Sequence, residues 1–133
     1  AQVGRPVKVA HGQPTVMAML ECYGASPVAW RVLARAADAF MTVDEADAVA
    51  VMRRLARPSA GDPVIVAGES GGVGLAGLIR AVADNRAELQ LDGKSRVLAI
   101  NTEGATDPHR YAELVGMSPA DVLAGKLTAE ATA

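Results

Sequence analysis

The sequence predicts an α/β domain in which part of a parallel twisted sheet carries helices on both faces. Two short apolar runs rich in β-branched residues, 63–67 and 96–100, are typical of strands buried on both faces. Each run leads into a loop and then a helix start, so strands and helices alternate along the chain. The 133 residues match one ordinary domain, and a hydrophobic content of 50% is ample for a packed core, which excludes a disordered tail.

The composition also excludes several classes of protein. The net charge is −2, from 15 acidic and 13 basic residues without a long block of either sign, which argues against a nucleic-acid partner. The single Cys22 allows no internal disulfide, and no cluster of Cys and His predicts a metal site. Because no apolar run approaches the roughly 18 residues of a membrane span, we expect a cytoplasmic protein without a membrane partner.

The first third of the chain is predicted to hold one short strand and two helices. Residues 6–10 form the strand, and the apolar run 15–23 forms a short helix that Gly24 ends. Ser26 and Pro27 begin the next helix as a hydroxyl cap and a proline at the first helical position. Its apolar positions recur at helical spacing and predict a buried stripe of Ala29, Leu33, Ala36 and Phe40.

The next helix, 44–57, is the best marked in the chain. Acidic side chains in its first turn and basic ones in its last oppose the charges of the helix dipole, worth roughly 0.3–1 kcal/mol per residue. We interpret the basic residues Arg53, Arg54 and Arg57 as a solvated helix end in preference to an anion site. Three residues are predicted to face inward, namely Val49, Met52 and Ala56.

The second half of the chain is predicted to place two loops at the carboxyl ends of strands. The first buried strand runs into a glycine-rich loop, 68–74, and the second into the loop 101–107. Further helices begin at Pro108 and Pro119, each preceded by a capping side chain. Ligands of parallel sheets bind beyond the carboxyl ends of the strands, so we look for function at these two loops. The helix between the loops has an apolar stripe of Leu75, Leu78, Ile79 and Val82.

The residues alone leave the role of the glycine loop open. Gly72, Gly74 and Gly77 form a G-x-G-x-x-G pattern that opens a helix, as in dinucleotide sites. However, residues 69–71 separate this pattern from the strand, and an acid for a ribose comes only at Glu103. In a structural interpretation, the glycines let a helix pack closely on its neighbours.

The two loops, in this order and spacing, resemble those of diaminopropionate ammonia-lyase. The similarity spans roughly residues 4–111 and is carried by segments 15–18, 27–30, 52–55, 68–75 and 97–107. The resemblance implies a fold-type-II pyridoxal-phosphate enzyme with a fold like that of tryptophan synthase β, in its intact form a homodimer. Such an enzyme converts 2,3-diaminopropionate, a small amino acid, to pyruvate and two ammonia molecules by α,β-elimination.

The resemblance also implies which residues lie beside the cofactor. Thr102 takes the place of the hydroxyl that meets the ring nitrogen, and Glu69 that of a residue beside the ring. Ser70 and Gly71 line the ring edge, and Asn101 adjoins them. In the structural alternative, Thr102 closes an ordinary turn and Glu69 is an acid at a helix N-terminus.

The family requires a lysine that bonds to the cofactor, and this chain has none in the expected context. Its lysines, Lys8, Lys94 and Lys126, lie in a strand, a turn and the tail. The resemblance places the lysine, the catalytic aspartates and the phosphate loop upstream of the matched region. We therefore expect residues 1–125 to be the C-terminal portion of an incomplete domain and 126–133 to be a frayed tail.

Such a chain contains no catalytic residue of its own and is expected to be inactive without the N-terminal part of the same enzyme. Two alternatives stay open. One is a small nucleotide-binding domain that uses the loop 72–77, and the other is a non-catalytic remnant that binds a partner through its exposed faces.

Overall fold

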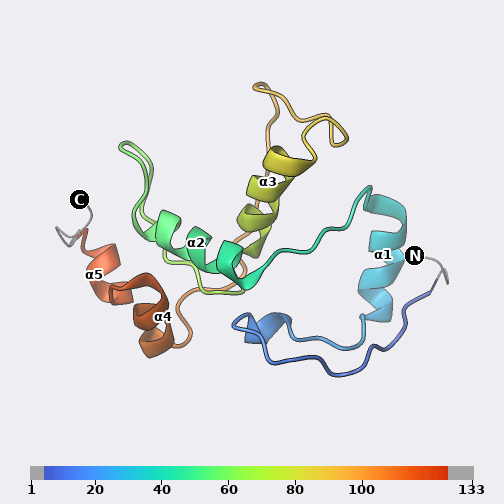
Figure 1. The fold of residues 1–133 in the computed structure, drawn as a ribbon, viewed down its shortest axis with the longest axis horizontal. Helices are drawn as coiled ribbons and strands as arrows, with labels where there is room; N and C mark the ends of the chain where they lie inside the picture. Colours follow the sequence, from blue (N-terminus) through green and yellow to red (C-terminus); the bar gives the residue numbers. More distant parts are fainter. Residues whose placement is uncertain (1–4, 126–133) are drawn as a thin grey trace.

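The structure is a computed structural model that describes residues 5–125, so the predicted tail lies outside the described residues. These residues contain a short 3-10 helix and five α-helices joined by extended segments and turns (Figure 1). In chain order they are η1 (Ala18–Leu20), α1 (Pro27–Ala36), α2 (Glu45–Ala56), α3 (Val73–Asp84), α4 (Pro108–Val115) and α5 (Pro119–Leu123).

Helix α2 is the centre of the packed part of the molecule. It contacts α3 and α4, and α4 in turn contacts α5. Figure 1 shows α1 standing apart from this group, joined to α2 by an extended segment. The packing therefore begins at α2 and extends toward the C-terminal end of the described chain.

The predicted helix starts are confirmed by their hydrogen bonds. Ser26 Oγ accepts from the backbone N–H of Ala29 at 3.4 Å and caps α1. At the start of α2, Asp44 and Asp47 form a capping box in which the Asp44 N–H donates to Asp47 Oδ2 at 3.2 Å. Ser118 Oγ likewise accepts from Asp121 N at the start of α5. These caps satisfy amides that the helix itself leaves free.

The core lies between α2, α4 and α5. Two of the three residues predicted to face inward from α2, Met52 and Ala56, are buried, whereas Val49 is half-buried. Burial of these side chains is the main favourable term that holds the helices together. The buried cluster consists of Met52, Ala56, Tyr111, Val115, Met117 and Val122.

The predicted buried stripe of α1 is wrong. No residue of α1 is buried, and Phe40 beyond its end is 70% exposed. The periodicity does mark an apolar face, but the other described elements leave it uncovered. Apolar spacing predicts which face of a helix is apolar, but burial of that face depends on another element that packs against it.

The stripe of α3 is only partly buried, and the helix packs with its small residues instead. Its buried residues are Ala76, Gly77 and Ala81. The predicted stripe has Leu75 and Leu78 half-buried, whereas Ile79 and Val82 are exposed. Because α3 is apolar on more than one face, the small-residue face meets α2 and part of the larger one is left free.

The predicted strands are not observed, so the parallel sheet is absent from residues 5–125. The segments 6–10, 63–67 and 96–100 have no strand assignment. The runs 63–67 and 96–100 were also expected to be buried; Ala67 is buried, whereas Leu98 is 86% exposed. A strand is defined by hydrogen bonds to a neighbouring strand, and no such neighbour lies within the described residues.

The predicted helix over 15–23 shrinks to the three residues of η1. Met19 and Leu20 are exposed, so no packing stabilises a longer helix. Isolated helices shorter than about 12 residues are marginal in water, which explains why the apolar run alone did not suffice. The backbone instead makes separate contacts, such as Val16 N donating to Glu45 Oε1 at 2.9 Å.

Candidate functional site

The two loops singled out in the sequence lie side by side. The backbone N–H of Gly68 donates to the carbonyl oxygen of Glu103 at 3.0 Å. The loops approach so closely that a side chain is excluded at two glycines. A Cβ on Gly68 would run into the Gly104 carbonyl, and one on Gly71 would run into Glu103 O and the Asn101 side chain.

The structure places the five candidate residues in two environments. Ser70, which is 4% exposed, and Gly71 are buried, and Glu69 is half-buried. Asn101 and Thr102 are exposed on the neighbouring loop. The Ser70 hydroxyl is buried without a hydrogen-bond partner among the described residues. No hydrogen bond within 5–125 occupies the Thr102 hydroxyl either, and of the two residues only Thr102 is exposed.

Asn101 faces the glycine loop. Two carbonyl oxygens, Gly71 O and Glu103 O, lie next to one end of its side-chain amide. Because a carbonyl only accepts, the nitrogen occupies this end and donates to Glu103 O at 2.9 Å and to Gly71 O at 3.3 Å. Asn101 thus bridges the two loops.

Glu103 is a residue of the site that the sequence interpretation underrated. Its Oε1 accepts from the Thr106 hydroxyl at 2.6 Å, and its Oε2 is buried without a partner in the described part of the chain. Its side chain lies against Gly68. The cap of α4 is Asp107 alone, whose Oδ1 accepts from His109 N and Arg110 N. The sequence feature that could have identified Glu103 as a site residue is its position directly after Thr102.

A small cleft of ≈ 110 Å³ lies where the two loops meet α2 and α3. Apolar side chains line most of it, among them Leu55, Leu75 and Ile100, and Gly71 and Asn101 close one side. The arrangement offers an apolar wall with a few polar groups at its edge, but the cleft is smaller than the roughly 300–1,000 Å³ of complete ligand pockets.

The glycines that suggested a nucleotide site are engaged in packing. A Cβ on Gly72 would meet Val51 Cγ1 at 2.9 Å, and one on Gly77 would meet the Met41 sulfur at 3.4 Å. These glycines allow α3 to approach α2 and the segment before it. The structural interpretation therefore accounts for them without a phosphate.

The described lysines lie outside the site. Lys8 and Lys94 are both exposed, and Lys94 sits in a turn where its N–H donates to Asp92 Oδ1 at 2.9 Å. Hydrogen bonds from Lys94 and Ser95 lower the pKa of Asp92, so the turn is held by a carboxylate. Lys126, the third lysine, is beyond the described residues.

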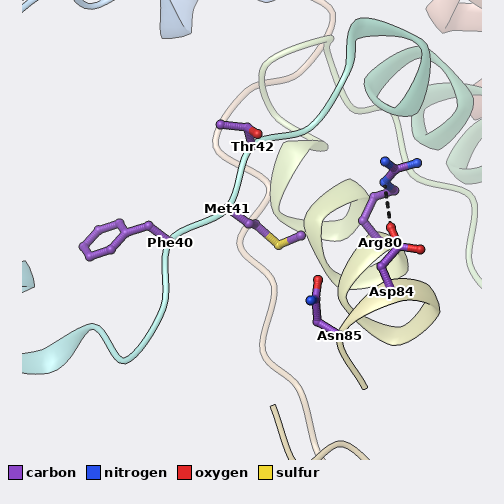
Figure 2. Close-up of a pocket in the computed structure, with 6 residues that line it drawn as sticks. All are labelled: Phe40, Met41, Thr42, Arg80, Asp84 and Asn85. Carbon is purple, nitrogen blue, oxygen red and sulfur yellow. Dashed lines mark ion pairs between the residues drawn. The ribbon is translucent and has the colours of Figure 1, made fainter. Parts of the chain in front are cut away.

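A larger cavity, of ≈ 450 Å³, lies elsewhere, between the segment after α1 and the end of α3. Figure 2 shows Phe40 pointing away from the helix and Arg80 turned toward Asp84. The Arg80 guanidinium pairs with Asp84 at 3.4 Å and with Asp47 at 3.7 Å. Its charge is thus already matched, and the cavity has no group poised for chemistry.

No helix formed by residues 5–125 combines the length and apolar character needed to cross a membrane. Across the same range, the His, Cys, Asp and Glu side chains form no group of three or more that could hold a metal ion.

The chain is similar in sequence to diaminopropionate ammonia-lyases, and the resemblance seen in its loops is confirmed. It is 37% identical over 118 residues to the enzyme of Escherichia coli strain K12. It is 34% identical over 119 residues to that of Salmonella typhimurium strain LT2. Both matches cover 84% of this chain but only 29% of the relative, so the chain spans less than a third of their length. No protein-family profile matches it.

Solved structures of the same kind of protein share the fold. One is the Escherichia coli diaminopropionate ammonia lyase in complex with an aminoacrylate-PLP azomethine reaction intermediate, with a TM-score of 0.71 and 37% identity. It matches 76% of this chain and 28% of that one. The holo enzyme with selenomethionine has a TM-score of 0.73 at 34% identity, over 86% of this chain and 29% of that one. The described residues thus have the fold of part of these lyases.

Proposed function

We propose that this chain is the C-terminal part of a pyridoxal-phosphate-dependent ammonia-lyase that acts on 2,3-diaminopropionate and releases pyruvate and ammonia. The observation that carries the proposal is the 37% identity over 84% of the chain. A match of that length cannot omit the middle of the chain, so both loops lie inside it. The Escherichia coli relative, which binds a PLP intermediate, therefore shares the region where the candidate residues lie.

The residues present fit the edge of the cofactor. A ring nitrogen needs one polar partner, and Thr102 has an exposed hydroxyl that no described residue occupies. Ser70 has a buried hydroxyl without a partner, a state that normally costs about 1–3 kcal/mol unless a ligand or water satisfies it. When bound, pyridoxal phosphate supplies an electron-accepting ring for the elimination.

The chain's own residues hold and orient the ring under this proposal. Thr102 meets the ring nitrogen with a neutral hydroxyl, which leaves that nitrogen unprotonated and suits elimination. Ser70 and Gly71 form the ring edge, Glu69 lies beside the ring, and Asn101 adjoins them. None of these residues removes a proton from the substrate, so the base belongs to another part of the enzyme.

The lysine that bonds the cofactor lies outside these 133 residues in the proposed enzyme. Lys8 and Lys94 are exposed, and Lys94 belongs to the turn held by Asp92. The partner of this chain is then the rest of the same polypeptide. The proposal includes a homodimeric, cytoplasmic enzyme whose activity this segment alone does not have.

The first experiment is the intact mass of the protein purified from its native source after borohydride reduction. Borohydride makes the bond between lysine and cofactor permanent. We expect a polypeptide longer than this chain that carries one reduced cofactor. The unreduced sample, denatured in parallel, is the control and loses that mass. A single species of 133 residues without cofactor would contradict the proposal.

A further inference from the structure

The segment around Thr102 is held against the glycine loop on both sides of that residue. Before it, the Asn101 amide nitrogen donates to Gly71 O at 3.3 Å and to Glu103 O at 2.9 Å. After it, Glu103 O accepts from Gly68 N at 3.0 Å, and the Glu103 side chain packs on Gly68. Both neighbours of Thr102 are thus hydrogen-bonded to the glycine loop, whereas the Thr102 side chain makes no hydrogen bond within residues 5–125.

This arrangement restricts the backbone of Thr102. Because Asn101 and Glu103 are both hydrogen-bonded to the glycine loop, the residue between them has little freedom to turn. The Thr102 side chain itself is exposed.

The Asn101 contact is specific to an amide nitrogen. Two carbonyl oxygens converge on it, and a carboxylate there would face two acceptors. The absence of a Cβ at Gly71 is what lets the amide come so close. Asn101 bridges the same two loops that the proposed cofactor site uses, without itself needing to touch the cofactor.

We infer that Asn101 is a positioning residue: by bridging Gly71 and Glu103 it fixes the direction in which Thr102 presents its hydroxyl to the cofactor ring. This inference rests on the proposed function, because the role of Thr102 is defined by the ring. It revises the role of Asn101 from a cofactor contact to a residue that acts through its neighbour.

The test is a double-mutant cycle in the full-length enzyme with the dissociation constant of pyridoxal phosphate as readout. The apoenzyme is titrated with the cofactor and followed by absorbance. Asn101→Ala is expected to raise the constant by up to about 10-fold, the upper end of the net value of one hydrogen bond. In a Thr102→Ala background the same change is expected to have less than about a twofold effect, because coupled residues are not additive.

The control is Asn85→Ala, the same substitution at the other asparagine of the chain, which lines the remote cavity of Figure 2. It should leave the dissociation constant unchanged in both backgrounds. If Asn101→Ala does not fold, Asn101→Ser replaces it, since a hydroxyl keeps one donor but cannot reach both carbonyls.

Two results would overturn the inference in different ways. Equal effects of Asn101→Ala in both backgrounds would mean that Asn101 does not act through Thr102, while the proposed function would stand. A wild-type enzyme that takes up no pyridoxal phosphate would remove the proposed function, and the inference with it.

Discussion

Tyr111 is the largest fully buried side chain of the core, and its hydroxyl has no partner among residues 5–125. Burial raises its pKa above the ordinary value of 10.0, and the nearby Arg57 guanidinium offsets part of this rise. A raised pKa means that the folded state keeps the phenol proton after the unfolded state has lost it. Stability is therefore fully present below pH 10.0 and falls as the pH rises beyond it.

Tyr111→Phe is expected to raise the free energy of unfolding by about 1 kcal/mol, because it removes a buried hydroxyl that lacks a hydrogen bond. It should also flatten the loss of stability above pH 10. Urea unfolding of the full-length enzyme at neutral and alkaline pH measures both effects. Tyr23→Phe is the control at neutral pH, since Tyr23 donates to Glu21 in an exposed pair. It is no control above pH 10, because the hydrogen bond to Glu21 raises the pKa of Tyr23 as well. A lower stability of Tyr111→Phe at neutral pH would contradict the prediction.

The end of α2 joins the end of α4, and arginines make the connection. Arg53 Nε donates to Leu114 O at 2.7 Å, and the Arg57 guanidinium donates to Val115 O at 3.1 Å. The last carbonyls of a helix lack partners within it, and cationic donors there also complement the helix dipole. From the sequence we interpret three arginines as a solvated helix end. Two of them, Arg53 and Arg57, instead cap the end of a neighbouring helix.

Arg53→Ala is expected to lower the free energy of unfolding by about 1 kcal/mol, the net value of one hydrogen bond at a partly exposed site. Arg54→Ala is the matched control, because this exposed neighbour makes no hydrogen bond or ion pair within the described range. Thermal unfolding of the two variants in the full-length enzyme gives the comparison. Equal melting temperatures would show that the connection between α2 and α4 adds nothing to stability.

At the scale of the whole molecule, much apolar surface is uncovered. The exposed side chains come from α1, α3 and the segment 96–100 and include Leu98, Val28, Phe40 and Ile100. Contiguous apolar patches on isolated proteins mark interfaces, and unpaired extended segments invite pairing. The chain spans 29% of the length of its curated relatives, and under the proposed function the rest of the same enzyme covers these faces.

Residues 1–133 expressed alone are accordingly expected to associate or to bind a hydrophobic dye strongly. Size-exclusion chromatography and dye fluorescence measure these two properties. Adding the separately expressed remainder of the enzyme should lower the dye signal and yield a defined complex. A compact monomer with a cooperative melt and little dye binding would refute this expectation.

The sequence proposed the candidate site, but not the contacts between its two loops. Ser70, Gly71 and Thr102 became candidates through the resemblance of the loop motifs to a known family. The bridge from Asn101 to Gly71 joins residues about thirty positions apart in the chain, so no local pattern predicts it. Burial of Glu103 Oε2 without a partner likewise depends on the packing of the two loops. Only the packed arrangement of the two loops shows which side chains they share.

The sequence by itself determined where the helices begin, because a cap such as Ser26 or Asp107 bonds to an amide two or three residues away. It likewise determined which faces are apolar and which family the loops resemble. Tertiary structure decided which of those faces are buried and that the segments 63–67 and 96–100 do not pair as strands. Burial and strand pairing need partners remote in sequence, and for these segments the described chain does not contain them.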